Sequence, residues 1–90
     1  MSERRAIIFS GKVQGVGFRA TTRSVMRGFA VSGWVRNEPD GTVRAEVQGE
    51  AGEIDAALAR LRERMGGYIR GEQAYPMGVE AGEEGFEIRR

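Results

Sequence analysis

The segment Arg5-Ala-Ile-Ile-Phe-Ser-Gly-Lys-Val-Gln-Gly-Val-Gly-Phe-Arg19 passes from a run of β-formers into a glycine-rich loop. Residues 5–10 predict a first strand, which ends at Gly11. Beyond the loop, apolar side chains recur at the spacing of one helix face, which predicts a helix that begins near Phe18. The first third of the chain therefore reads as strand, loop and helix.

A second strand and a third strand follow, joined by a tight turn. Residues 31–37 are rich in β-formers, and Pro39-Asp40-Gly41 is a turn signal because Pro presets φ and Gly accepts positive φ. Residues 42–48 then alternate strictly, with Val43, Ala45 and Val47 on one side and polar residues on the other. We expect these two strands to form a hairpin.

The remainder of the chain predicts one more helix and two more strands. After Gly49, the residues Ile54, Ala57, Leu58, Leu61 and Met65 form an apolar stripe that ends at Gly66-Gly67. Residues 68–75 predict a weaker, irregular strand, because Gly71 interrupts it and Pro76 closes it. The alternation of Phe86 and Ile88 with charged residues predicts a short last strand.

The element order is thus β-α-β-β-α-β with a C-terminal strand added. Right-handed crossovers pack both helices on one face of an antiparallel sheet. We expect an α+β, ferredoxin-like sandwich formed by a single domain over residues 1–90.

The composition excludes several kinds of catalytic site. The 90 residues contain no His and no Cys, so there is no imidazole base, no thiolate nucleophile and no His or Cys metal ligand. We expect no metal and no cofactor. A net charge of +1 argues against a nucleic-acid binder. No stretch approaches a membrane span or a signal peptide, so we expect a cytoplasmic protein, with a monomer as the default.

The loop between the first strand and the first helix has the features of a phosphate cradle. Gly11, Gly15 and Gly17 allow tight bends that turn successive N–H groups toward one point. The loop leads into a helix N-terminus, which favours an anion. Arg19 places a guanidinium where a cation is locally unfavourable, which makes sense if an anion lies between it and the backbone donors. The competing interpretation is that the loop is only a connection.

Asn37, at the end of the second strand, has two interpretations. It could shape the turn, since Asn side chains bond nearby backbone. Its amide could instead hold a water molecule, because the oxygen accepts and the nitrogen donates hydrogen bonds.

Two motifs together resemble the signatures of the acylphosphatase family. The first is Gly11-x-Val13-Gln14-Gly15-Val16-x-Phe18-Arg19, and the second is Gly33-Trp34-Val35-Arg36-Asn37-x-x-Asp40-Gly41. They stand at the right interval, and the ending Gly85-Phe86-Glu87-Ile88 extends the resemblance over nearly the whole chain. The irregular segment after the second helix departs from the family pattern, so the geometry of the fourth strand is left open.

The resemblance implies a ferredoxin-like fold with a five-stranded antiparallel sheet. It implies hydrolysis of the carboxyl–phosphate bond of acyl phosphates to a carboxylate and inorganic phosphate, without a metal. Arg19 corresponds to the family's phosphate-binding arginine and Asn37 to its water-orienting asparagine. The cradle corresponds to the backbone of Gln14, Gly15, Val16, Gly17, Phe18 and Arg19.

Three alternatives share this topology. An RNA-recognition domain needs stacking aromatics on its central strands, and residues 42–48 contain none. A metallochaperone needs a Cys-x-x-Cys motif, which is absent. An acylphosphatase-like domain that is non-catalytic or binds carbamoyl phosphate stays open as the alternative function.

Overall fold

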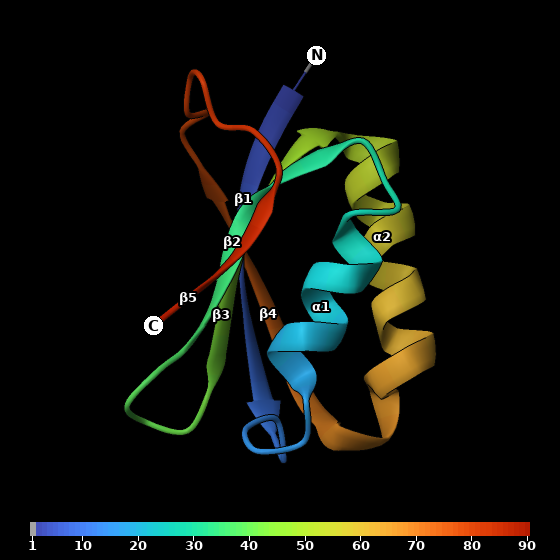
Figure 1. The fold of residues 1–90 in the computed structure, drawn as a ribbon, viewed down its shortest axis with the longest axis vertical. Helices are drawn as coiled ribbons and strands as arrows, with labels where there is room; N and C mark the ends of the chain where they lie inside the picture. Colours follow the sequence, from blue (N-terminus) through green and yellow to red (C-terminus); the bar gives the residue numbers. More distant parts are fainter. Residues whose placement is uncertain (1) are drawn as a thin grey trace.

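The computed structural model describes residues 2–90 and contains five strands and two α-helices arranged as an α+β sandwich (Figure 1). Both helices cover the same face of the sheet. None of the helices in this part of the chain has the length and apolar character needed to cross a membrane. The elements run in the order β1 (Ser2–Gly11), α1 (Phe18–Met26), β2 (Val31–Asn37), β3 (Val43–Glu50), α2 (Ala51–Met65), a 3-10 turn (Gly66–Tyr68), β4 (Ile69–Met77) and β5 (Phe86–Arg89).

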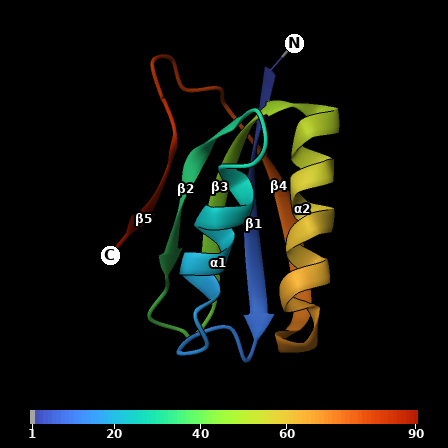
Figure 2. The same ribbon diagram turned by 45° about the vertical axis from the view of Figure 1, so that its right-hand side comes forward.

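The sheet has the strand order β4-β1-β3-β2-β5, which Figure 2 shows with the helices in front. β1 pairs antiparallel with β3 and β4, and β2 pairs antiparallel with β3. The fourth strand, left open by the sequence, is continuous over nine residues, with one register shift opposite Ser10/Gly11. The predicted element order and the ferredoxin-like layers are confirmed.

The expected all-antiparallel sheet is wrong in one respect, because β5 runs parallel to β2. β4 ends beside the start of β1, at the end of the sheet where β2 begins. The connection over residues 78–85 crosses only this end, so Phe86 enters the sheet opposite Gly33. An antiparallel β5 would require a connection along the whole length of the sheet. The parallel direction carries the last residues to the opposite end.

The core lies between the sheet and the two helices. The alternating residues of β3 face the helices as predicted, and Val43, Ala45 and Val47 are fully buried. Ile7 and Phe9 of β1 lie beside them, and the ring centroid of Phe9 is 5.1 Å from that of Phe18. The residues of both predicted helical stripes that lie in helices are buried, α1 through Phe18, Thr22, Val25 and Met26, and α2 through Ile54, Ala57, Leu58, Leu61 and Met65. Phe29, predicted to continue the first stripe, lies beyond the end of α1 and is partly buried. This packing fixes the start of α1 against the end of β1.

The other face of the sheet carries a buried ion-pair network around Arg4. The Arg4 side chain is 1% exposed; its Nε donates to Glu46 Oε1 at 2.8 Å, and its Nη1 donates to Glu83 Oε1 at 2.8 Å. Ser32 Oγ also donates to Glu83 Oε1, at 2.8 Å. Desolvation would raise the pKa of Glu83, but the hydrogen bonds from Arg4 and Ser32 hold that pKa below its ordinary value. These bonds anchor the 78–85 connection to the sheet.

Candidate active site

The loop of residues 12–17 bends as the glycine pattern predicts. Gly15 and Gly17 have φ values of 77° and 76°, in the left-handed region that favours glycine. A Cβ at either position would meet no atom within 4 Å, so the loop backbone there lies open. The start of the loop is held to the 3-10 turn before β4, where Lys12 N donates to Tyr68 O at 2.9 Å.

The loop leads into an uncapped N-terminus of α1. Gly17 is the N-cap residue, no side chain bonds the free N–H groups there, and the first turn contains no acidic residue. Such an end carries partial positive charge and free donors, which together favour an anion. Arg19 lies in this first turn and has no acidic partner among residues 2–90. No acidic side chain of the described residues therefore pairs with the positive charges at this end of α1.

A hollow of about 250 Å³ opens beside this helix end. Five of the predicted site residues line it, namely Gly15, Gly17, Phe18, Arg19 and Asn37. Its other lining residues are Val13, Ala20, Ile88 and Arg90. Among the described residues the lining includes two arginines, Arg19 and Arg90, and no acidic side chain. The hollow therefore suits an anionic ligand.

Ile88 and Arg90 were missed by the sequence prediction. They reach the hollow because β5 runs parallel to β2, so that both strands end at the same end of the sheet. An antiparallel last strand would have placed Phe86 there instead. No local sequence signal specifies the direction of so short a strand.

The Oδ1 atom of Asn37 is buried and has no hydrogen-bond partner among residues 2–90. A buried acceptor without a donor costs about 1–3 kcal/mol, so native proteins seldom keep one without a role. Its unsatisfied Oδ1 counts against the interpretation that Asn37 only shapes the turn, because a turn-forming amide would bond nearby backbone.

Two predicted cradle residues lie outside the lining of the hollow. Val16 is partly buried and packs against the core. Gln14 is partly buried too, and its Nε2 donates to Glu38 O at 2.8 Å and to Thr42 O at 2.9 Å. The side chain of Gln14 thus contacts the β2–β3 hairpin, which the sequence motif did not predict.

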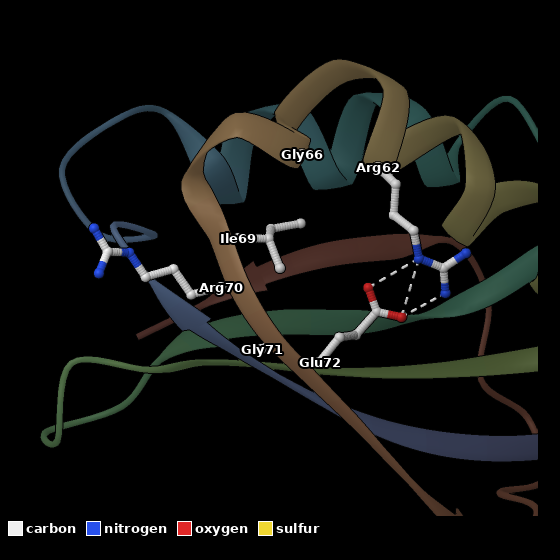
Figure 3. A pocket seen from close by; sticks show the side chains of 6 residues that line it. All are labelled: Arg62, Gly66, Ile69, Arg70, Gly71 and Glu72. Atoms are coloured by element: carbon white, nitrogen blue, oxygen red, sulfur yellow. Dashed lines mark hydrogen bonds and ion pairs between the residues drawn. The ribbon is translucent and has the colours of Figure 1, made fainter.

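A larger hollow of about 360 Å³ lies between the end of α2 and β4 (Figure 3). Arg62 Nε donates to Glu72 Oε1 at 3.0 Å across it, so two of its three charged lining residues are paired with each other. Arg70 points away from this pair (Figure 3). This hollow therefore contains a carboxylate that already pairs with one of its arginines, whereas the described lining of the first hollow has no acidic side chain.

The fold and the first hollow define a ferredoxin-like α+β protein with an anion-suited site at the ends of β1, β2 and β5. A sequence profile of the acylphosphatase family matches residues 5–88. An acylphosphatase of Rubrobacter xylanophilus is 39% identical, over 98% of this chain and 81% of the relative. An acylphosphatase of Bordetella parapertussis is 46% identical, over 93% and 82% of the two chains.

Solved structures agree with these sequence matches. The structure of an acylphosphatase from Coxiella burnetii superposes with a TM-score of 0.84 at 27% identity, covering 98% of this chain and 93% of that chain. This chain belongs to the acylphosphatase family.

Proposed function

We propose that this chain hydrolyses the carboxyl–phosphate bond of acyl phosphates in the hollow between the 12–17 loop and the end of β2. Family membership supports the reaction, since the family model covers residues 5–88. The observation that carries the assignment of the site is the unpaired, buried Oδ1 of Asn37 in a hollow that Arg19 also lines.

The phosphate group binds at the N-terminus of α1. Arg19 offers a planar fork of donors to two phosphate oxygens, and the backbone N–H groups of the loop and first helical turn supply further donors. Gln14, Gly15, Val16, Gly17, Phe18 and Arg19 form this cradle. The open backbone at Gly15 and Gly17 supports it, because no side chain there would keep a phosphate at a distance.

Asn37 orients the attacking water. Its unpaired Oδ1 accepts a hydrogen bond from the water, which places the water oxygen for attack on phosphorus opposite the leaving carboxylate. An amide is not a base at neutral pH, so the water's proton passes to an oxygen of the substrate phosphate. The P–O bond to the acyl group breaks, and the carboxylate leaves with the bonding electron pair.

This chemistry needs few catalytic groups. A carboxylate is a weakly basic leaving group, so it needs no general acid. Phosphoryl transfer passes through a loose transition state, so positioning and charge stabilisation supply most of the rate. The chain has no His or Cys that could carry a phosphoryl intermediate, which favours direct attack by water.

The alternative is a non-catalytic or carbamoyl-phosphate-binding domain of this family. Such a domain needs the phosphate cradle but has no need of a water-orienting amide. The unpaired Asn37 Oδ1 and the relatives named acylphosphatase favour the enzyme. Monomeric state and cytoplasmic location stay predictions from the sequence; sedimentation velocity tests the first.

The function is tested by comparing benzoyl phosphate with p-nitrophenyl phosphate in a buffer that contains a chelator. We expect turnover of the acyl phosphate and none of the monoester, whose phenolate is the more basic leaving group. Equal turnover of both compounds would contradict the leaving-group argument, and no turnover of benzoyl phosphate would favour the binding domain.

A further inference from the structure

The Gln14 carboxamide joins the 12–17 loop to the β2–β3 hairpin. Both of its N–H groups are used, one on Glu38 O at 2.8 Å and one on Thr42 O at 2.9 Å. Within residues 2–90 no other hydrogen bond links residues 12–17 with residues 38–42. Among the described residues, the Gln14 side chain therefore makes the only hydrogen-bonded connection between the loop and the hairpin turn that follows Asn37.

The two carbonyls that Gln14 contacts are the ones that close the hairpin. Glu38 N donates to Thr42 O at 2.9 Å, and Gly41 N donates to Glu38 O at 3.1 Å. The Gln14 amide is a second donor to each of these carbonyls. Its hydrogen bonds therefore form with the turn in the conformation that the backbone hydrogen bonds already hold. Asp40 braces the same turn, because its Oδ1 accepts from Thr42 N at 3.0 Å and from Thr42 Oγ1 at 2.6 Å. The turn is therefore a preformed docking point for Gln14.

Asn37 lies directly before this docking point. It is the last residue of β2 and pairs with Val43, so its backbone moves with the hairpin. The cradle residues Gly15 and Gly17 follow Gln14 in a loop that glycine makes adaptable. Without the amide, the position of Asn37 relative to the cradle would depend on the sheet and on helix packing alone.

We propose that Gln14 is a positioning residue, which sets Asn37 and its water at the correct distance from the phosphate held by the loop. This proposal rests on the proposed function. The Gln14 side chain does not act on substrate, because both of its N–H groups are committed to the hairpin carbonyls and it lies outside the lining of the hollow. It acts through Asn37.

A double-mutant cycle tests the proposal with Gln14→Met, Asn37→Ala and the double variant. Methionine keeps the length of the side chain and removes both donors. Because small misplacements of a reacting group cost up to about a hundredfold in rate, we expect Gln14→Met to lower kcat by on the order of tenfold or more, with a smaller change in the inhibition constant for phosphate. In the Asn37→Ala background, Gln14→Met should lower kcat no further.

Gln48→Met is the matched control. Gln48 Nε2 also donates to a backbone carbonyl, that of Glu80 at 2.9 Å, but at the other end of the sheet. We expect the Gln48→Met substitution to lower the melting temperature and to leave kcat unchanged. Equal losses of kcat from Gln14→Met in the wild-type and Asn37→Ala backgrounds would overturn the proposal, as would a wild-type kcat in Gln14→Met.

Amide hydrogen exchange keeps the proposal testable without catalysis. If the wild-type protein did not hydrolyse benzoyl phosphate, the proposed function would fail while the tether could still be examined. We expect Gln14→Met to speed exchange in residues 12–17 and 38–42 together, and Gln48→Met to leave both segments as in the wild type. Unchanged exchange in these segments of Gln14→Met would refute the tether itself.

Discussion

Arg19 and Asn37 line the same hollow from two different elements. Arg19 lies in the first turn of α1, and Asn37 lies at the end of β2. Arg19 has no acidic partner in the described chain, and Asn37 Oδ1 is buried without a donor. The Arg19 guanidinium can therefore still bind a negatively charged group, and Asn37 Oδ1 can still accept a hydrogen bond. A phosphate and a water molecule together would satisfy both.

Removal of the Arg19 guanidinium should weaken phosphate binding and turnover together. Loss of one preorganised charged donor costs about 3–4 kcal/mol in the transition state, so Arg19→Ala should reduce kcat/KM by about two to three orders of magnitude. Its inhibition constant for phosphate should rise as well, because the same guanidinium binds the ground state. Arg27→Ala, at an exposed arginine after the same helix, is the control and should keep both constants. Wild-type phosphate affinity in Arg19→Ala would contradict the assigned role.

Turnover should not depend on a divalent metal ion. In the proposed mechanism the leaving group is a carboxylate and the positive charge for the transition state comes from Arg19 and backbone N–H groups, so no step requires a metal. We expect kcat for benzoyl phosphate to be unchanged after dialysis against EDTA. An activity that is lost with EDTA and restored by Mg²⁺ would refute the mechanism.

The glycines of the loop should matter for activity beyond their effect on stability. At Gly17, with φ 76°, a side chain meets open space, so Gly17→Ala should cost about 1–2 kcal/mol of backbone strain without a steric clash. Gly82 has φ 79° and equally open surroundings, but lies in the 78–85 connection. Gly82→Ala should therefore show a similar loss of stability in urea unfolding and keep wild-type kcat/KM, whereas Gly17→Ala should lose activity. A similar kcat/KM in the two variants would mean that the loop backbone does not contact substrate.

The network around Arg4 should make stability depend on acid pH. The pKa of Glu83 is lowered in the folded protein, so its contribution is fully present above the ordinary value of 4.5 and is lost as the pH falls through the lower, folded-state value. Glu46 behaves in the same way: desolvation opposes the shift, but the bonds from Arg44 and Arg4 outweigh it and lower its pKa.

Glu83→Gln tests this network at the end of the sheet away from the hollow. The free energy of unfolding of the variant should be about 1.5–3 kcal/mol lower than that of wild type at pH 7. The reason is that Arg4 then faces a neutral amide in place of the Glu83 carboxylate. The difference should shrink as the pH falls below 4.5. The exposed neighbour Glu84→Gln is the control and should change stability little. A constant difference between Glu83→Gln and wild type from pH 7 to pH 3 would show that the charge of Glu83 is not involved.

Local signals in the sequence were sufficient for the elements and for most of the candidate site. The glycines of the loop, the Pro39-Asp40-Gly41 turn and the alternation in residues 42–48 act within a few residues, so each could be recognised without knowledge of the fold. The backbone at Gly15, Gly17 and Gly41 has the positive φ values that these residues permit.

The features that could not be predicted depend on contacts between distant segments. The parallel direction of β5 follows from where β4 ends, and that direction brings Arg90 to the hollow. The hydrogen bonds of Gln14 reach across to the backbone carbonyls of Glu38 and Thr42, and no sequence pattern marks these carbonyls as acceptors for Gln14. Such contacts cannot be predicted from the spacing of residues along the sequence.

The most direct test of the central claim is the pair of constants measured for Asn37→Ala, namely kcat for benzoyl phosphate and the inhibition constant for inorganic phosphate. If Asn37 orients the water while Arg19 and the loop hold the phosphate, kcat should fall by about two to three orders of magnitude and phosphate should bind nearly as well as to wild type. A wild-type kcat in Asn37→Ala, or a loss of phosphate affinity as large as the loss of kcat, would contradict the account.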